Sequence, residues 1–415
     1  MTGRRDIILL FTTRIVRLFC YGFLSVVLAL YLIQVGLSER TVGLIFTLTL
    51  AGDAGISLWL TTSADRFGRQ RTLIAGALLM IGAGLVFIFT RNPIALAIAA
   101  IIGVISPSGN EIGPFLSVEQ AALTQLIPGE KRTQTFAWYA LAGSLATATG
   151  ALSGGWLAQV LQQHGYSALN SYRVVLAGYA LGGLVMIGLF LSLSNAVEIK
   201  SVEKGDQPLF LGLHRSRSVV LRLSGLFAMD AFAGALIVQS LLAYWFHVKY
   251  GVDTGVIGSI FFGANILAGL SALFAARIAR RFGLINTMVF THIPSNIFLI
   301  LVPLMPNLPL AIGMLLARFS ISQMDVPTRQ SYTMAVVAPD ERSAASGVTT
   351  IARSFGAALA PSLAGVLMAV PALLSAPFFL AGGLKIGYDF LLYRSFRGMR
   401  PPEERESLGI SGVKS

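Results

Sequence analysis

Ionisable side chains inside long apolar stretches are the feature of this sequence that points most directly to chemistry. In a membrane each such residue costs about 2.5–3.5 kcal/mol to insert, so it is expected to serve function or to pair with a residue that does. Lys385 and Asp389, four residues apart on one helix face, are interpreted as a local structural pair. The whole set is Arg14, Arg17, Asp53, Glu111, Glu119, Asp230, Arg318, Asp325, Arg329, Arg353, Lys385 and Asp389.

Two of these stretches combine charge with helix-breaking residues. Ser106–Pro114 has the sequence SPSGNEIGP, in which two prolines bracket Asn110 and Glu111. The related stretch Ala317–Gln330 has the sequence ARFSISQMDVPTRQ. Because proline and glycine weaken a helix, backbone groups freed at membrane depth need protein or a cavity beside them. We expect the solute or coupling-ion site here, with a purely structural kink as the alternative.

The roles within this predicted site follow from charge. A buried carboxylate can take up and release a proton, so Glu111 is the first candidate for proton coupling, and Asp325 or Asp53 is the next. Arg318 and Arg353 could hold an anionic group of a solute, or they could neutralise these carboxylates.

The composition indicates that membrane-spanning helices position these residues. Apolar residues make up 55% of the 415 residues and charged residues only 12%, whereas soluble domains carry about 25% charge. The apolar stretches have the roughly 20-residue length of a transmembrane helix rather than the roughly ten-residue alternation of an outer-membrane barrel. The formal net charge is +12, but the basic residues lie at the ends of apolar stretches. This placement excludes a nucleic-acid-binding patch and is typical of membrane topology.

We predict an all-α membrane protein of twelve transmembrane helices in two pseudo-symmetric six-helix halves. The expected organisation is an N-terminal half at 1–194, a cytoplasmic linker at 195–218, a C-terminal half at 219–394 and a cytoplasmic tail at 395–415. The expected spans are 8–33, 41–62, 72–90, 94–127, 134–160, 171–194, 219–248, 254–277, 285–305, 308–337, 344–370 and 373–394.

The distribution of lysine and arginine predicts that both termini are cytoplasmic. The loops after the even-numbered spans carry most of these residues, and the opposite loops carry few. Arg14 and Arg17 interrupt the first apolar stretch, and no small-residue cleavage site follows it. We therefore expect a retained first helix and a cell membrane of the bacterial inner type.

The two predicted halves are copies of one unit. Three segments of the first half recur in the second at an offset of 210 or 215 residues. Parallel repeats of this kind are a known transporter architecture, in which the binding site lies between the repeats. The matching segments are Ala64–Gln70 with Ala279–Leu284, Val42–Phe46 with Ile257–Phe261, and Arg132–Gly155 with Arg342–Gly365.

The loop after the second span resembles a motif of the major facilitator superfamily, Gly-x-x-x-Asp-Arg-x-Gly-Arg-Arg/Lys, and the resemblance covers nearly the whole chain. The matching residues are Asp65, Arg66, Gly68 and Arg69 and, in the second copy, Arg281 and Gly283. Thr61, Gln70 and Arg280 depart from the motif. The resemblance implies that this loop stabilises the outward-open state, with Asp65 near the amino end of helix eleven, where a carboxylate is favoured.

A second resemblance concerns Gly150–Gly155, which has the sequence GALSGG. It is similar to the glycine-rich pattern of the family's antiporters, Gly-Pro-x-x-Gly-Gly, with Ala151 in place of the proline. Small residues at this spacing equally suit close packing of helices, and we favour that interpretation.

In the fold of that family, helices one, four, seven and ten line the central cavity, and opposite charges occupy equivalent positions on them here. Glu119 aligns with Arg329 at an offset of 210, and Arg17 aligns with Asp230 at an offset of 213. We expect some of these charges to face each other across the halves. Glu119 and Arg329 are the expected gating residues, and Arg17 and Asp230 are expected in the solute or coupling-ion site. Pairing within one half is the alternative.

The sequence thus predicts a secondary transporter that moves a small solute by alternating access. Export by proton antiport is favoured. One alternative is proton-coupled uptake of a small solute that can be anionic, and another is a non-transporting sensor of the same fold. The sequence holds no phosphate-binding loop, no nucleophile–base motif and no metal-type histidine spacing. We therefore expect no enzyme activity, cofactor or metal. The expected partners are the solute, a coupling ion and the lipid bilayer, and we expect a monomer.

Overall fold

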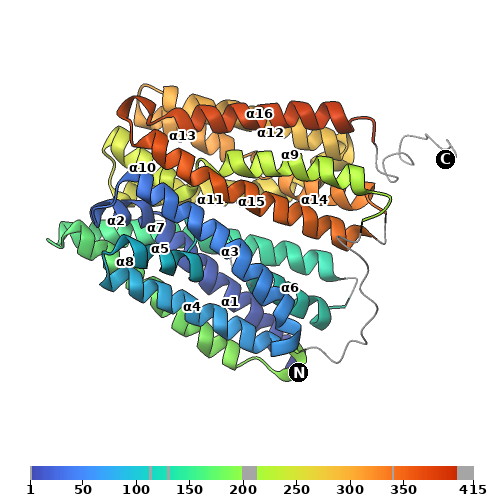
Figure 1. Ribbon diagram of the computed structural model, residues 1–415, viewed down its shortest axis with the longest axis horizontal. Helices are drawn as coiled ribbons and strands as arrows, with labels where there is room; N and C mark the ends of the chain where they lie inside the picture. Colours follow the sequence, from blue (N-terminus) through green and yellow to red (C-terminus); the bar gives the residue numbers. More distant parts are fainter. Residues whose placement is uncertain (1, 112–114, 129–130, 199–212, 339–340, 400–415) are drawn as a thin grey trace. The chain divides into compact units, whose positions relative to one another are not determined.

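The computed structural model describes residues 2–111, 115–128, 131–198, 213–338 and 341–399, except the side chains of 2–3, 60–66, 133 and 343 (Figure 1). The first eight α-helices are α1 (Thr2–Ser25), α2 (Leu28–Gln34), α3 (Glu39–Phe67), α4 (Arg69–Phe89), α5 (Pro93–Ile102), α6 (Phe115–Leu126), α7 (Arg132–Gln163) and α8 (Ala168–Leu191). The next eight are α9 (Arg217–Ala235), α10 (Gln239–Tyr250), α11 (Thr254–Phe282), α12 (Leu284–Leu301), α13 (Leu308–Phe319), α14 (Asp325–Val336), α15 (Arg342–Met368) and α16 (Ala376–Phe396).

Four predicted spans each consist of two shorter helices. Span one is α1 and α2, span four is α5 and α6, span seven is α9 and α10, and span ten is α13 and α14. The kinks expected in spans four and ten are therefore complete interruptions. In span four, Gly109 has a φ angle of +69°, which residues other than glycine rarely adopt. Among the residues that the structure describes, eight helical segments are long and apolar enough to cross a bilayer, and the shorter α5 and α13 are also apolar.

The two copies of the charged loop are one-residue turns. Gly68 alone separates α3 from α4, and Gly283 alone separates α11 from α12. Their φ angles are +94° and +84°, in the region that favours glycine. The repeat found in the sequence is therefore also present in the backbone.

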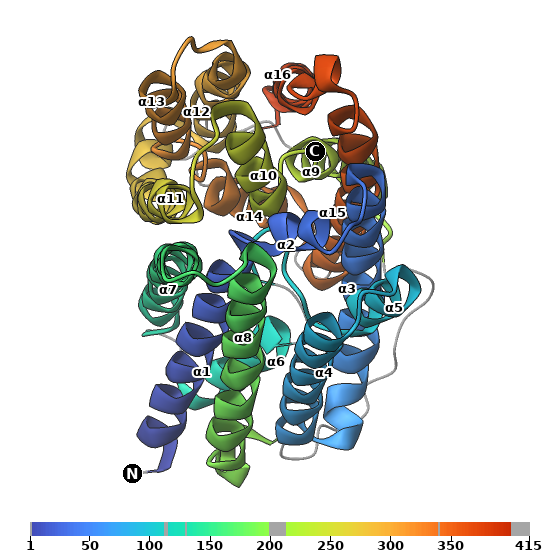
Figure 2. The same cartoon turned by 90° about the vertical axis from the view of Figure 1, so that its left-hand side faces the viewer.

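The chain forms two compact units. The first comprises Met1–Glu203, Ala235–Ile266 and Ala358–Pro377, and the second comprises Lys204–Gly234, Leu267–Ala357 and Phe378–Ser415. In the first unit, α1 packs on α7 and α8, and α4 packs on α8 (Figure 2). In the second unit, α12 packs on α13 and α14. The predicted boundaries of the sequence halves stay a prediction, and residues 199–212 of the linker and 400–415 of the tail lie outside the described residues.

Within the first unit, glycines bring segments of both sequence halves into backbone contact. A Cβ atom added at Gly365 of α15 would lie 2.9 Å from the Cα of Gly43 in α3. One added at Gly155 of α7 would lie 2.9 Å from the Cα of Gly258 in α11. Gly43 aligns with Gly258 and Gly155 with Gly365, so the two contacts are repeat-related. In the predicted orientation, both lie toward the outer side of the membrane.

The glycine-rich stretch Gly150–Gly155 also serves packing inside the first sequence half. Cβ atoms added at Gly150 and Gly154 would lie 2.1 Å from the carbonyl oxygens of Phe19 and Phe23 in α1. A side chain at either position would therefore force α1 and α7 apart, as the packing interpretation predicts.

Candidate functional site

The first unit holds a buried network of two arginines and two glutamates. Arg17 of α1 is fully buried and donates from Nε to Glu111 Oε1 at 2.6 Å and from both Nη atoms to Glu119 at 2.8 Å. Arg14 binds the other carboxylate oxygen of Glu111 at 2.9 Å. The hydroxyl of Tyr139 in α7 also donates to Glu119. Two arginines balance two glutamates, so the network has no net charge.

Glu111 and Asn110 lie in the interruption between α5 and α6. The carbonyl of Pro107, which is free of helical bonding there, accepts from the backbone N–H of Ser240 at 3.0 Å and from its hydroxyl at 2.7 Å. The hydroxyl of Ser106 donates to the carbonyl of Asn110 at 2.8 Å. These bonds satisfy backbone groups that a lipid environment would leave unpaired. The side chain of Asn110 is exposed, and that of Glu111 remains 13% exposed.

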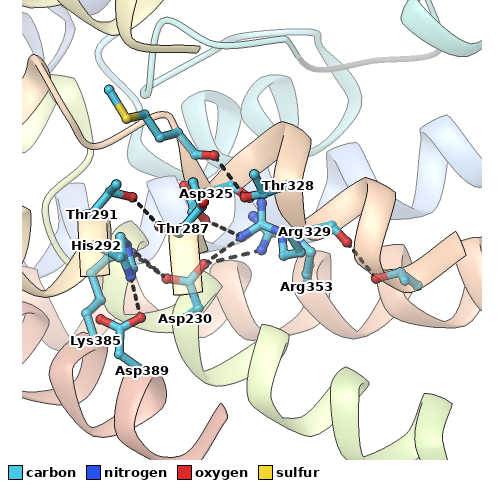
Figure 3. Close-up of polar contacts among 12 residues, drawn as sticks. Asp230, Thr287, Thr291, His292, Asp325, Thr328, Arg329, Arg353, Lys385 and Asp389 are labelled. Atoms are coloured by element: carbon cyan, nitrogen blue, oxygen red, sulfur yellow. Dashed lines mark hydrogen bonds and ion pairs between the residues drawn. The ribbon is translucent and has the colours of Figure 1, made fainter. Parts of the chain in front are cut away.

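The second unit holds a larger network around Asp230 of α9 (Figure 3). One carboxylate oxygen lies 2.5 Å from Lys385 Nζ of α16. The other lies 3.2 Å from Arg329 Nη1 of α14 and 3.3 Å from Arg353 Nη1 of α15. Arg329 also binds Asp325 at 2.8 Å, one helical turn away. Four helices thus meet at one buried carboxylate.

A histidine that the sequence interpretation missed belongs to this network. His292 Nδ1 of α12 lies 2.8 Å from Asp389 Oδ1, and its Nε2 lies 3.9 Å from Asp230 Oδ1. Asn296 Nδ2 donates to the other oxygen of Asp389 at 3.2 Å. The predicted local pair of Lys385 and Asp389 is therefore wrong, because each side chain finds a partner on another helix.

The second network has more cations than carboxylates. The carboxylates are Asp230, Asp325 and Asp389, and the arginine and lysine side chains around them are Arg318, Arg329, Arg353 and Lys385. The Arg353 side chain is 34% exposed, and the buried Nε of Arg318 has no hydrogen-bond partner in the part of the chain that the structure describes. These two arginines are the least compensated members, which fits an anionic group better than a cation.

The gating residues of the sequence interpretation lie in different places. Glu119 and Arg329 each bind partners of their own sequence half, which corresponds to the alternative of pairing within a half. The exchange of partners across the halves stays a prediction. Asp53, a lower-ranked candidate for proton coupling, accepts from Ser57 within α3 at 3.0 Å. Arg281 is exposed and lies over the ring of Phe282 at 5.3 Å.

The charged loop after α3 contacts the segment that follows α8. Glu198, which the sequence interpretation did not single out, accepts from the backbone N–H groups of Arg69 at 2.8 Å and Gln70 at 3.0 Å. Its carboxylate therefore stabilises the amino end of α4. Arg69 Nη1 donates to the carbonyl of Val197 at 3.1 Å. The side chains of Asp65 and Arg66 lie outside the described residues.

Comparison with known proteins identifies the family. The sequence model of the Major Facilitator Superfamily matches residues 10–361 and 249–410. The chain belongs to the major facilitator superfamily. The predicted fold of twelve membrane-spanning helices is thereby confirmed, and the protein is a membrane transporter by family.

The alignments with known relatives cover almost the whole of this chain. The uncharacterized membrane protein YJR124C of Saccharomyces cerevisiae is 32% identical over 425 residues, with 95% of each chain covered. Among solved structures, the nucleoside transporter NupG has a TM-score of 0.71 at 13% identity, covering 94% of this chain and 99% of its own. A D-xylose–proton symporter has a TM-score of 0.70 at 14% identity, covering 93% and 97%. At these identities the structures show a shared fold.

Proposed function

We propose that this superfamily member exports a small organic solute from the cytoplasm in exchange for protons. The observation that carries the proposal is the interruption of spans four and ten beside buried ion-pair networks. Interrupted helices supply free backbone groups and room for a ligand at the middle of a membrane. Buried carboxylates supply groups that change charge when they bind a proton.

Glu111 is the proposed coupling group of the first network. Arg14 and Arg17 both bind it, and of the two carboxylates in the network it is the one that retains solvent access beside the helix interruption. A proton on Glu111 neutralises its carboxylate and breaks the ion pair with Arg14. One proton therefore changes the net charge of the network and the contacts beside Asn110. Binding of solute and binding of a proton would then compete, as exchange requires.

Uptake of an anionic solute together with protons is the second candidate. The excess of cations in the second network supports it, because Arg318 and Arg353 have unused capacity for a carboxylate, phosphate or sulfate group. A proton carried inward with such an anion would offset its charge.

The experiment compares the small-molecule content of cells making the intact protein with that of cells making Glu111→Gln. Asp253→Asn is the matched control, because this carboxylate is exposed in the short turn after α10. A compound depleted only with the intact protein and the control supports export and names the solute. A compound enriched instead supports uptake, and equal contents under varied growth conditions support a non-transporting sensor.

The proposal also includes a setting for the protein. Both termini face the cytoplasm, the bilayer is a cell membrane of the inner type, and one chain is sufficient for transport. Reporter fusions at each terminus and the mass of the purified protein in detergent test these statements.

A further inference from the structure

The breaks of spans one, four and seven meet at a buried polar junction in the first unit. Ser240, the second residue of α10, lies at its centre, and its hydroxyl oxygen is 2.7 Å from the carbonyl oxygens of both Ser25 and Pro107. A hydroxyl has one proton, so the two carbonyl oxygens share it. The backbone N–H of Ser240 also donates to Pro107 at 3.0 Å. Because Ser25 ends α1 and Pro107 lies between α5 and α6, one fully buried side chain links three interrupted spans.

Gln239 extends this junction to the backbone beside Asn110. Its Nε2 donates to Ser25 Oγ at 2.8 Å. A Cβ atom added at Gly109 would lie 3.0 Å from Ser25 Oγ and 3.4 Å from Gln239 Nε2, so both side chains pack against the backbone of Gly109. The φ angle of +69° at Gly109 lies in the region that favours glycine. The junction therefore contacts the segment Ser106–Glu111 on the residue that gives it its turn.

A hydrogen bond inside the segment connects Pro107 to Asn110. The hydroxyl of Ser106 donates to the carbonyl of Asn110 at 2.8 Å, which closes the residues between them into one turn. Pro107 lies inside this turn and is held by Ser240 through two donors. The position of Pro107 therefore sets the positions of Asn110 and of Glu111, the residue that follows it.

The sequence repeat does not explain the junction. At the offset of 213 residues, Ser240 aligns with Val27 and Gln239 aligns with Val26, and a valine side chain can donate no hydrogen bond. In the break of span ten, the buried hydroxyl of Ser322 has no hydrogen-bond partner among the residues that the structure describes. A junction that is built once, at the break that carries Asn110 and Glu111, indicates a task specific to that break.

We propose that Ser240, with Gln239, is a positioning residue for solute recognition: it fixes the shape of Ser106–Glu111 and so sets where Asn110 and Glu111 meet the solute. This inference rests on the proposed solute site at the break of span four. A segment that is already ordered does not have to be ordered when the solute binds, and this strengthens binding. Loss of the Ser240 hydroxyl should therefore weaken recognition although Asn110 and Glu111 are both still present.

Pulsed electron paramagnetic resonance of the purified full chain tests the positioning without solute. One spin label replaces the exposed Asn110, and the other replaces the exposed Tyr166 in the turn between α7 and α8 of the same unit. In Ser240→Ala the population of displaced distances, outside the main peak, is expected to rise about 2–10-fold, as expected for the loss of one hydrogen bond. Ser240→Thr retains the hydroxyl and should keep the main peak.

Two further variants complete the test. Ser271→Ala is the matched control, because it removes a buried hydroxyl that has no partner among the described residues, and it should leave the distances unchanged. Gln239→Leu removes the other side-chain donor of the junction and should also increase the displaced population. The measurement therefore does not depend on whether Ser240→Ala folds.

The cell comparison tests the connection to solute recognition. Ser240→Ala should weaken the change in metabolite content that the intact protein produces, and Ser240→Thr should restore it. A merely structural contact would instead lower the amount of folded protein and leave the distances of the remaining protein unchanged.

Three results would overturn the inference: unchanged distances in both Ser240→Ala and Gln239→Leu, an equal increase of the displaced population in Ser271→Ala, or an undiminished metabolite change in Ser240→Ala. Any of them would leave proton-coupled export standing, because the effect of Glu111→Gln in cells does not depend on Ser240. Equal metabolite contents for the intact protein and Glu111→Gln, together with the expected distances, would instead refute export and leave the ordering of the segment by Ser240 in place.

Discussion

The substitution Gly365→Ala is expected to open the outer contact between α3 and α15. The added Cβ atom would lie 2.4 Å from the carbonyl oxygen of Glu39 and 2.9 Å from the Cα of Gly43. Ordinary van der Waals contact begins near 3.4 Å, so the two helices must separate by about 1 Å. The obstructing atoms belong to backbone and cannot rotate away.

The size of the effect follows from the cost of overpacking. An extra methyl group in a well-packed contact costs about 1–3 kcal/mol. If alternating access separates α3 and α15 on the outer side, this cost applies only to the state in which they touch. The equilibrium is then expected to move by about 5–150-fold toward the outward-open state.

Pulsed electron paramagnetic resonance measures this shift as a change in the populations of two distances. Spin labels at the exposed positions Arg40 and Ala372 report on the outer ends of α3 and α15, and Cys20 is buried and should label poorly. Gly347→Ala on α15 is the matched control, since a Cβ atom there meets nothing within 4 Å. The repeat-related Gly258→Ala should give a smaller shift, because its closest contact is 2.7 Å.

Equal distance distributions for Gly365→Ala, Gly347→Ala and the unsubstituted protein would refute this reasoning. Loss of folded protein in Gly365→Ala alone would also count against it, because the contact would then be needed for folding rather than for one transport state. A shift in the distance populations that is larger for Gly365→Ala than for Gly258→Ala supports a gate, and loss of folded protein supports a structural contact.

Three further outcomes are expected. Arg17→Gln should lower the free energy of unfolding by about 3–5 kcal/mol, because Glu119 remains buried without its cation. The double variant Arg17→Gln/Glu119→Gln should regain part of this free energy. Unfolding of the purified protein in mixed micelles measures both values. Burial opposes ionisation of Glu341, but hydrogen bonds from the backbone N–H groups of Ser216 and His214 lower its pKa to about 2. The stability advantage over Glu341→Gln should therefore be complete above pH 4.5 and disappear as the pH falls toward 2 in thermal unfolding. Tyr244→Phe removes a 2.6 Å hydrogen bond to Glu39 and should favour the outward-open state by about 1.5–3 kcal/mol in the same distance measurement.

The fold could be predicted because its signals are local in the sequence. Apolar stretches of helix length, basic loops and the recurring Gly68 and Gly283 turns identified the spans and their repeat. The interruptions of spans one and seven could not be predicted in the same way. Their short breaks, at 26–27 and 236–238, consist of apolar residues that do not differ in hydropathy from the helices around them.

The candidate site could be predicted only in part. The sequence identified the charged residues, because charge inside an apolar stretch is conspicuous. It could not assign partners, because they come from distant segments: His292 meets Asp389 across 97 residues, and Lys385 meets Asp230 across 155 residues. Four-residue spacing predicted a bond between Lys385 and Asp389, but in the structure each of these side chains binds a partner on another helix. A histidine and an amide four residues apart, His292 and Asn296, were the available signal for the missed part.

The most direct test of proton-coupled export uses the purified protein in vesicles that contain a pH indicator and the solute named by the cell comparison. An imposed pH gradient should drive the solute against its own concentration gradient, with protons moving the opposite way, and Glu111→Gln should abolish both fluxes. Solute that only equilibrates across the membrane, with no proton movement, would contradict proton-coupled exchange.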